Sequence, residues 1–219
     1  MIDLFFPRLC QTCGQRLFSQ EACICIRCTH LLPLACHHRD NDTELQDRFY
    51  GRLRLSGATS LLQFQKSGAT QKLLHKLKYR SQQQIGDYLG KWLGTELRQT
   101  SFAQTDVVIP VPLHKRKLRK RGYNQVAAFG QALAITLGAK YRDDVLIRTR
   151  HARSSVFKGR FARSSTSNPF KIKLVEAIGG MSVLLVDDIV TTGMTMEHCG
   201  SSIWEANPSA LRLATMFIA

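Results

Sequence analysis

One segment narrows the possible folds of this chain more than any other. Val183–Val186 is an unbroken aliphatic run, and Asp187 and Asp188 follow it directly. A strand that is apolar on both faces is typical of the interior of a parallel sheet. The turn Thr191–Thr195 comes next, and a helical pattern then runs from Thr195 to Ala206. The segment therefore predicts a central strand that carries two carboxylates at its exposed end.

Strand and helix patterns alternate through the rest of residues 51–219. Short apolar runs predict strands, and leucines at helical spacing predict helices. Strands are expected at Ala58–Phe64, Asp106–Ile109, Val145–Thr149 and Leu211–Ile218, and helices around Leu73–Leu77, Ile85–Leu97 and Tyr123–Leu137. This alternation predicts an α/β fold, a parallel sheet with flanking helices, in which ligands bind beyond the carboxyl ends of the strands.

The residues after the central strand suit a phosphorylated sugar. Carboxylates accept hydrogen bonds from the vicinal hydroxyls of a ribose. The N–H groups of the turn and the start of the next helix favour a phosphate, and Gly193 lets the backbone approach it closely. We therefore expect a ribose 5-phosphate group, such as that of phosphoribosyl pyrophosphate (PRPP). The expected phosphate-binding residues are Val190, Thr191, Thr192, Gly193, Met194 and Thr195, with Asp187 and Asp188 on the sugar.

An apolar strand that ends in acids also occurs in P-loop nucleoside triphosphatases. That class needs the pattern Gly-x-x-x-x-Gly-Lys-Ser/Thr. The nearest segment is Gly86–Trp92, in which the glycines stand one residue too close and a tryptophan replaces the hydroxyl residue. The sequence therefore excludes this class.

Two basic segments contain no acid. His114–Arg121 holds six lysines and arginines, and residues 148–173 hold eight more, in a chain of net charge +15. Such runs are often only solvated surface, but this excess of charge exceeds what one pyrophosphate needs and favours a longer polyanion, such as single-stranded nucleic acid. Tyr123, Phe157 and Phe161 could stack on bases, and the two phenylalanines could equally anchor a loop. The candidate residues are His114, Lys115, Arg116, Lys117, Arg119, Lys120, Arg121 and Asn124.

Six of the seven cysteines fall between positions 10 and 36. In a reducing compartment such clustering predicts metal ligands. The pairs Cys10/Cys13 and Cys25/Cys28 each enclose two residues, and together they predict a closed, structural Zn²⁺ site. Cys23, or Cys36 with His37 or His38, remains an alternative ligand, and an iron–sulfur cluster is a second kind of occupant.

The chain divides into three zones. Residues 1–36 form a cysteine-rich zinc-binding module, the polar residues 37–50 a connector, and residues 51–219 the α/β domain. No apolar run reaches the length of a membrane span, and the first residues lack the basic flank of a secretory signal. A cytoplasmic protein without membrane insertion is expected.

Several motifs along the chain resemble those of a known family. The segment Leu185–Gly193 looks like the PRPP motif of type I phosphoribosyltransferases. The remaining matches are Cys10–Cys13, Cys25–Pro33, Lys76–Tyr79, Val108–His114 and Arg121–Gln125. In this combination the chain resembles the ComF family of competence-associated, phosphoribosyltransferase-like proteins. The resemblance implies a type I phosphoribosyltransferase fold and a role in natural transformation, in the handling of imported single-stranded DNA. It also suggests that Asn124 and Gln125, which could simply cap a helix, face the site.

The chain departs from that family after the predicted strand Val145–Thr149. Thr149, Arg163 and Phe170 stand where the family pattern has Thr, Arg and Phe, but Ser155 and Thr166 replace the usual Gln and Asn. In active phosphoribosyltransferases this loop closes over the site, and here residues 150–168 are expected to form a long, mobile basic loop.

Two hypotheses follow from these features. The first is a binding protein for PRPP and single-stranded DNA, with partners in the DNA-uptake machinery. The second is a phosphoribosyltransferase that uses PRPP with Mg²⁺ and in which Asp187 and Asp188 are catalytic; a regulator that senses PRPP is a third. No segment of the sequence predicts an acceptor.

Overall fold

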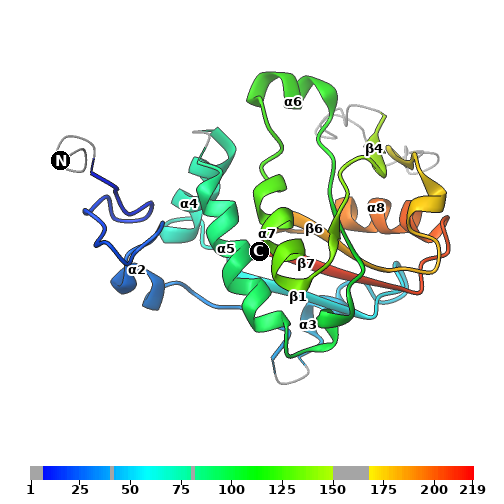
Figure 1. Ribbon diagram of the computed structural model, residues 1–219, viewed down its shortest axis with the longest axis horizontal. Coiled ribbons are helices and arrows are strands. Elements are labelled where there is room, and N and C mark those ends of the chain that lie inside the picture. The colour runs from blue at the N-terminus through cyan, green and yellow to red at the C-terminus, as the bar shows by residue number, and fades with distance from the viewer. Residues whose placement is uncertain (1–6, 40–41, 80–81, 150–167) are drawn as a thin grey trace, which may run out of the picture.

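The computed structural model describes residues 7–39, 42–79, 82–149 and 168–219 and is shown in Figure 1. Its centre is a five-stranded sheet in the order β1–β7–β6–β2–β3, and all neighbouring pairs are parallel. The strands are β1 (Gly57–Gln63), β2 (Val107–Pro110), β3 (Lys140–Tyr141), β6 (Ser182–Val190) and β7 (Ala210–Ile218). The predicted α/β fold is confirmed, and the strand with the two aspartates lies in the middle of the sheet.

Helices cover both faces of this sheet. α4 (Ala69–Tyr79), α5 (Gln84–Leu97) and α7 (Ala127–Leu137) pack on one face, and α8 (Met194–Trp204) packs on the other. In β6, Leu184 and Val186 belong to the first core cluster, whereas Val183 and Leu185 belong to the second. Successive side chains of a strand point to opposite faces, so one aliphatic run holds both layers together.

Helices α5 and α7 lie side by side (Figure 1) at a distance that only glycine permits. A Cβ atom at Gly90 would come within 2.6 Å of the carbonyl oxygen of Phe129 and within 2.8 Å of the Ala132 Cβ. This close packing fixes α7, and with it the residues that precede α7 at the edge of the sheet.

Most predicted elements are present with shifted bounds. α7 begins at Ala127 and not at the predicted Tyr123, because the Asn124 side chain accepts a hydrogen bond from the Val126 N–H and forms a turn. The predicted strand Val145–Thr149 appears as β4 (Leu146–Arg148). It pairs antiparallel with β5 (Phe170–Ile172) in a separate two-stranded sheet. Among the described residues, the short 3-10 helices η1 (Ser101–Gln104) and η3 (Val175–Ala177) lie in the connections.

The basic segment after β2 folds as helix α6 (Lys115–Arg121), which the sequence analysis did not predict. No residue of α6 is buried, so it has no apolar face that periodicity could detect. The His114 side chain caps its start by accepting from the Arg116 N–H, and Gly122 ends it with a φ of 82°. Figure 1 shows α6 standing away from the sheet at the top of the molecule.

The cysteine-rich residues pack against the α/β domain. Cys10, Cys23, Cys25 and Cys28 share a core cluster with Leu73 and Leu77 of α4. α2 (Ile26–His30) follows the second cysteine pair, and the Lys76 ammonium of α4 donates to the Gln11 carbonyl at 2.7 Å.

The residues between the cysteine-rich segment and β1 also contribute to the core. They include α3 (Glu44–Asp47), and the side chains of Leu45 and Phe49 are fully buried in the second cluster, with residues of α8 and β6. The polar composition of residues 37–50 therefore hides two core positions.

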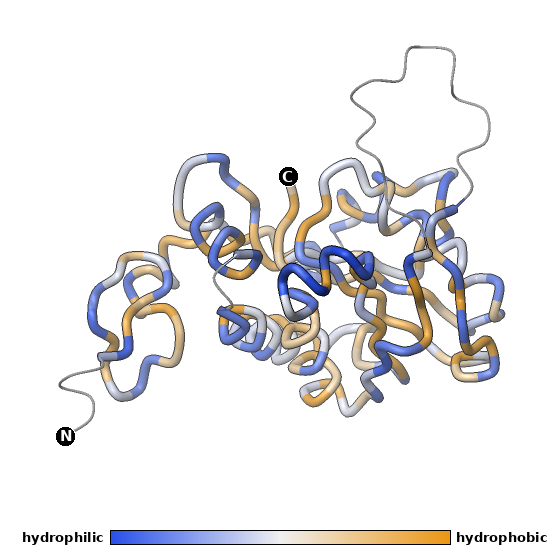
Figure 2. The backbone as a smooth tube through the Cα atoms, turned by 90° about the horizontal axis from the view of Figure 1, so that it is seen from above, coloured by the Kyte–Doolittle hydropathy of each residue, from blue (hydrophilic) through white to orange (hydrophobic). Residues whose placement is uncertain are grey.

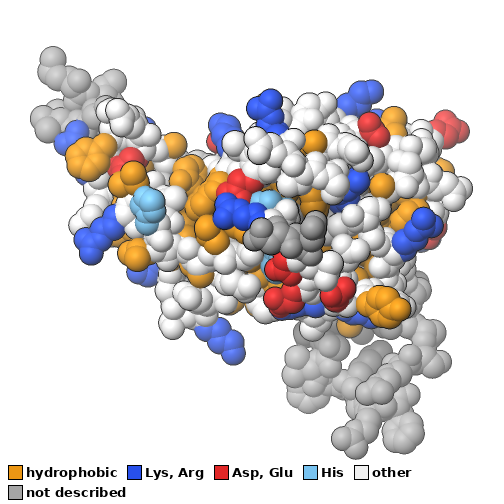
Figure 3. All heavy atoms as spheres, turned by 90° about the horizontal axis from the view of Figure 1, so that it is seen from below, with side chains coloured by type: hydrophobic (Ala, Val, Ile, Leu, Met, Phe, Trp, Pro, Cys, Tyr) orange, Lys and Arg blue, Asp and Glu red, His pale blue; other side chains and the backbone are white. Residues whose placement is uncertain are grey.

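Exposed hydrophobic side chains gather at the end of the molecule that carries the cysteine-rich segment (Figure 3). They include Phe18, Ile26 and Leu31, each more than half exposed. Within the described residues, no helix has the length and hydropathy needed to cross a bilayer.

Candidate functional site

The two aspartates lie near the carboxyl end of β6 and are almost entirely buried, with 8% of Asp187 and 4% of Asp188 exposed. The Asp188 N–H donates to Asp187 Oδ1 at 2.8 Å. After Val190 the chain turns, and Gly193 adopts a φ of 78° directly before α8 begins. The left-handed conformation of Gly193 explains why glycine is needed at this position.

The turn encloses a small hollow of about 30 Å³. It is lined by Asp187 and by residues 189–196, which include all six of the expected phosphate-binding residues. No described side chain caps the start of α8, so among these residues its first N–H groups have no side-chain acceptor. A helix start of this kind attracts a phosphate through its N–H groups and its dipole.

A larger cleft of about 200 Å³ adjoins the hollow and shares Asp187 and Thr195 with it. Besides these two residues, its lining comprises Lys78, Tyr79, Val111, Pro112, Leu113, Lys117, Arg121, Gln125, Arg148 and Asp188. These residues come from α4, the segment after β2, α6, the turn before α7, β4 and β6. The cleft thus lies at the carboxyl ends of β2 and β6, where ligands bind in parallel sheets.

The cleft is organised by Asp188. Its Oδ2 atom lies 3.1 Å from the Lys78 ammonium and accepts a hydrogen bond from Gln125 Nε2 at 3.0 Å. The Arg121 guanidinium bonds to the Gln125 oxygen and lies 5.7 Å from the centre of the Tyr79 ring. Asp188 is therefore paired with a cation from α4 and held by a side chain from the turn before α7.

Asp187 has less compensation. Burial raises its pKa well above the ordinary 3.8, and the neighbouring charge of Asp188 raises it further. The Asp188 N–H, Lys78 and Arg148 act in the opposite direction without cancelling this effect. A bound cation, or hydroxyl donors from a sugar, would stabilise the ionised form that the protein alone disfavours.

The structure separates the predicted basic residues into two groups. Lys117 and Arg121, one helical turn apart, line the cleft, whereas Lys115, Arg116, Arg119 and Lys120 are exposed and do not line it. Figure 2, in which α6 faces the viewer, shows this hydrophilic helix above the site.

The other two predicted residues do not line the cleft themselves and make structural hydrogen bonds. His114 caps α6 through its Nδ1 atom. Asn124 donates to the Val111 carbonyl at 3.0 Å and caps Val126, whereas its neighbour Gln125 does line the cleft.

Several cleft residues were not among the predicted site residues, including Lys78, Tyr79 and Arg148. Lys78 and Tyr79 belong to a motif that supported the family resemblance, so the signal was present but no role was attached to it. Arg148 follows from no motif; it reaches the cleft because β4 folds away from the main sheet. Its guanidinium lies 5.0 Å from the centre of the Phe170 ring, and its buried Nε atom has no hydrogen-bond acceptor among the described residues.

The predicted loop and its residues Ser155, Phe157, Phe161, Arg163 and Thr166 lie outside the described residues. Thr149, just before the gap, donates to the Pro169 carbonyl, and Phe170 is buried.

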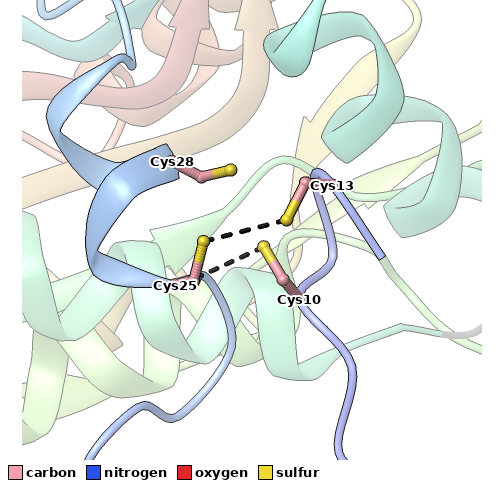
Figure 4. Close-up of side chains that lie close together, drawn as sticks. All are labelled: Cys10, Cys13, Cys25 and Cys28. Atoms are coloured by element: carbon pink, nitrogen blue, oxygen red, sulfur yellow. Dashed lines mark hydrogen bonds between the residues drawn. The ribbon is translucent and has the colours of Figure 1, made fainter. Parts of the chain in front are cut away.

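The four cysteines of the two pairs form one cluster (Figure 4), in which their Sγ atoms all lie within 4.8 Å of one another. The Cys13 and Cys25 sulfurs are 3.8 Å apart, the spacing of about 3.8 Å that sulfurs at ~2.3 Å from a tetrahedral zinc would have. Burial disfavours the Cys10 thiolate, but the N–H groups of Cys13, Cys25 and Thr12 stabilise it and lower its pKa to about 6. This cluster of four thiols, one of them readily ionised, could hold a structural zinc ion.

The alternative ligands lie elsewhere. Burial raises the pKa of Cys23 to about 12, so this thiol stays protonated. Cys36 and His38 lie in a separate group with Glu96 and not with the cysteine pairs. Glu96 already accepts hydrogen bonds from Arg39 at 2.7 Å and from Trp92 at 2.7 Å.

Comparisons with known proteins agree with this arrangement. The family described as "Phosphoribosyl transferase domain" matches residues 126–218. The DNA utilization protein YhgH of Escherichia coli O157:H7 is 32% identical over 129 residues, which cover 57% of this chain and 56% of that protein. Competence protein ComFC of Streptococcus pneumoniae is 33% identical over 126 residues, covering 55% and 53%, and Competence protein F of Haemophilus influenzae is 26% identical over 140 residues, covering 58% of each. The chain thus spans little more than half the length of the relatives it matches.

Solved structures give more distant matches. The glutamine PRPP amidotransferase of Bacillus subtilis has a TM-score of 0.44 and 20% identity, covering 64% of this chain and 30% of that one. An adenine phosphoribosyltransferase has a TM-score of 0.39 and 17% identity, covering 70% and 77%.

The raised pKa of Asp187 predicts how stability depends on pH. The folded protein binds the Asp187 proton more tightly than the unfolded chain does. The resulting contribution to folding stability is therefore fully present below the ordinary pKa of 3.8, and it is lost as pH rises through the raised pKa of the folded state. We expect Asp187→Asn, which cannot ionise, to unfold at a higher urea concentration than the wild type at about pH 7, with the difference closing towards about pH 4.

Asp144→Asn is the matched control with the opposite sign. The hydrogen bond from Arg142 lowers the pKa of Asp144, so this contribution is present at neutral pH and is lost as pH falls. An Asp187→Asn variant that is less stable than the wild type at neutral pH would contradict the expectation.

Proposed function

This chain belongs to the ComF family of competence-associated proteins with a phosphoribosyl transferase domain, and from that premise we propose that it binds two ligands. The first is PRPP or a similar ribose 5-phosphate ligand, bound at Asp187–Thr195. The second is single-stranded DNA, bound on the basic surface beside that site. The observation that carries the proposal is the hollow at the start of α8, which adjoins a cleft lined by both cations and carboxylates.

The lining of the two cavities supports a PRPP-type ligand part by part. The hollow at the start of α8 takes the 5-phosphate, and the ribose hydroxyls reach the carboxylates of Asp187 and Asp188. The pyrophosphate then extends into the cleft towards Lys117, Arg121 and Arg148. Mg²⁺ suits the same ligand, because it binds one or two carboxylates together with phosphates, and it would reduce the repulsion between the aspartates.

The outward residues of α6 support the second ligand. Lys115, Arg116, Arg119 and Lys120 are exposed, do not line the cleft, and form no ion pair with a described acid. A row of such charges binds the backbone of a nucleic acid without base preference. The relatives named for competence and DNA utilization favour DNA as that polyanion.

A structural zinc ion at Cys10, Cys13, Cys25 and Cys28 is part of the proposal. The cluster holds four sulfurs within 4.8 Å of one another and has no fifth metal-binding side chain among the described residues. Such a closed site stabilises a fold and leaves no position for a substrate.

A phosphoribosyl transfer reaction is the second candidate. It uses the same site, and the buried Asp187 favours it, because buried acids with a raised pKa concentrate at catalytic centres. Release of pyrophosphate from PRPP by the purified protein would distinguish transfer from binding.

The ribose site predicts the effect of removing both carboxylates. Asp187→Asn with Asp188→Asn keeps the volume of both side chains but removes their charges. The affinity for PRPP in the presence of Mg²⁺, measured by calorimetry, is expected to fall by at least ~1.5–3 kcal/mol. Asp87→Asn, at an exposed residue paired with Lys91, serves as the control and leaves the affinity unchanged. A folded double variant that binds PRPP like the wild type would show that the ligand lies elsewhere.

The division of α6 predicts that DNA binding and PRPP binding can be separated. Changing Lys115, Arg116, Arg119 and Lys120 to glutamine should weaken binding of a single-stranded oligonucleotide and leave PRPP affinity intact. The slope of log affinity against log salt should flatten by roughly 0.7 for each phosphate contact that is lost.

The matched variant changes the two cleft residues. Lys117→Gln with Arg121→Gln should weaken PRPP binding more than DNA binding, because these residues line the cleft. A wild-type protein that binds no oligonucleotide at moderate salt would remove the nucleic-acid part of the proposal and leave the PRPP site.

Elemental analysis tests the zinc site. About one zinc per chain is expected in protein purified without chelator, and Cys10→Ser with Cys13→Ser should abolish it. Cys23→Ser should retain the metal, because that thiol is outside the cluster and stays protonated. Zinc that persists in the double variant, or its absence from the wild type, speaks against the assignment.

A further inference from the structure

The back of the phosphate-binding turn is covered by residues far from it in sequence. Phe49, which follows α3, is fully buried and packs directly on Gly193. A Cβ atom at Gly193 would lie 2.8 Å from Cε1 of that ring and 3.0 Å from its Cζ. The ring therefore limits how far the turn can retreat from the hollow on its other side.

Arg52 contacts the same turn by hydrogen bonds. Its Nη1 atom donates to the Thr192 carbonyl at 3.4 Å and lies 3.0 Å from Glu197 Oε2. The guanidinium also lies 5.6 Å from the centre of the Phe49 ring. Phe49 and Arg52 thus form one unit behind the turn, which we call the brace.

The bond to the Thr192 carbonyl has a consequence for the front of the turn. In a trans peptide the C=O and the following N–H point in opposite directions, and the described residues contain no cis bond. With the Thr192 carbonyl held towards Arg52, the Gly193 N–H is directed to the opposite side of the peptide. Arg52 thereby orients one of the N–H groups that a phosphate would use.

The ion pair with Glu197 adds an electrostatic effect. Glu197 stands in the first turn of α8, close to where the phosphate would bind, and its charge opposes an anion there. Pairing with Arg52 offsets that charge. The geometric and electrostatic effects of the brace therefore favour the same ligand group.

We propose that Phe49 and Arg52 are positioning residues for the 5-phosphate of the ligand, acting through the Thr192–Gly193 peptide. This inference rests on the proposed ribose 5-phosphate site and extends it to a segment that lies outside the residues 126–218 matched by the phosphoribosyl transferase family. The brace selects for the 5-phosphate and leaves the pyrophosphate end of the cleft untouched, because none of the cleft-lining residues contacts Arg52 in the described structure.

The test compares variants of Arg52, which is 40% exposed and so can be changed without emptying the core. Arg52→Met removes the donors and the charge, Arg52→Lys keeps the charge on an ammonium group that can still donate, and Arg54→Met is the control. Arg54 lies 5.1 Å from the Trp204 ring and makes no described contact with the turn. Ribose 5-phosphate and inorganic pyrophosphate are titrated separately by calorimetry.

We expect Arg52→Met to raise the Kd for ribose 5-phosphate about tenfold, as for the loss of one hydrogen bond to a charged group. Arg52→Lys should recover most of that loss, and Arg54→Met should show none. The Kd for pyrophosphate should not change in any of the three. Equal losses for both ligands, or an unchanged Kd for ribose 5-phosphate in Arg52→Met, would overturn the proposal.

Amide hydrogen exchange separates this inference from the proposed function on which it rests. In ligand-free protein, Arg52→Met and Phe49→Leu should accelerate exchange of the N–H groups at residues 192–195, and Arg54→Met should not. If the wild type binds no ribose 5-phosphate, the proposed ligand site fails, while faster exchange in this segment still supports the brace. Unchanged exchange in both brace variants would refute it.

Discussion

The burial of two adjacent carboxylates at the end of the central strand is the constraint around which the described structure is arranged. Ionised acids in a protein interior need partners, because desolvation opposes their charge. Asp188 receives Lys78 from α4 and Gln125 from the turn before α7. Asp187 accepts a hydrogen bond from the Asp188 N–H, and the charge of Arg148 from β4 lowers its pKa in part. Elements distant in sequence thus meet at one edge of the sheet, and the cleft is the space between them.

This arrangement sets stability against ligand recognition. In the protein alone the protonated form of Asp187 is favoured, since burial and the charge of Asp188 both raise its pKa. Such a locally unfavourable group is expected where function requires it, while the surrounding aliphatic strand follows every ordinary rule of packing. The proposed ligand, through its hydroxyl donors or a bound cation, would offset this energetic disadvantage.

The elements that could be predicted from the sequence are those whose burial imposes a periodic pattern on it. Val183–Val186 and the leucines of α4 and α5 reveal their elements because burial imposes a period on them. Helix α6 has no buried residue and owes its bounds to His114 and Gly122, so periodicity could not find it. Lys78 and Arg148 reach the cleft only through the packing of α4 and the separate pairing of β4 with β5, which are tertiary facts. Phe49 lies in a polar stretch, and a single buried aromatic gives no pattern at all.

Helix α4 contacts both the cysteine cluster region and the cleft. Lys76 holds the Gln11 carbonyl between the first two clustered cysteines, and two residues later Lys78 holds Asp188. The same helix shares its core cluster with those cysteines. A segment so joined does not behave as an interchangeable cassette: recombination that moved residues 1–36 alone into another protein would leave apolar surface behind on α4 and separate Gln11 from its lysine. The smallest stretch that could be inherited as a unit therefore runs from the cysteines through α4. Substitutions in the cysteine-rich segment and in α4 are expected to depend on one another.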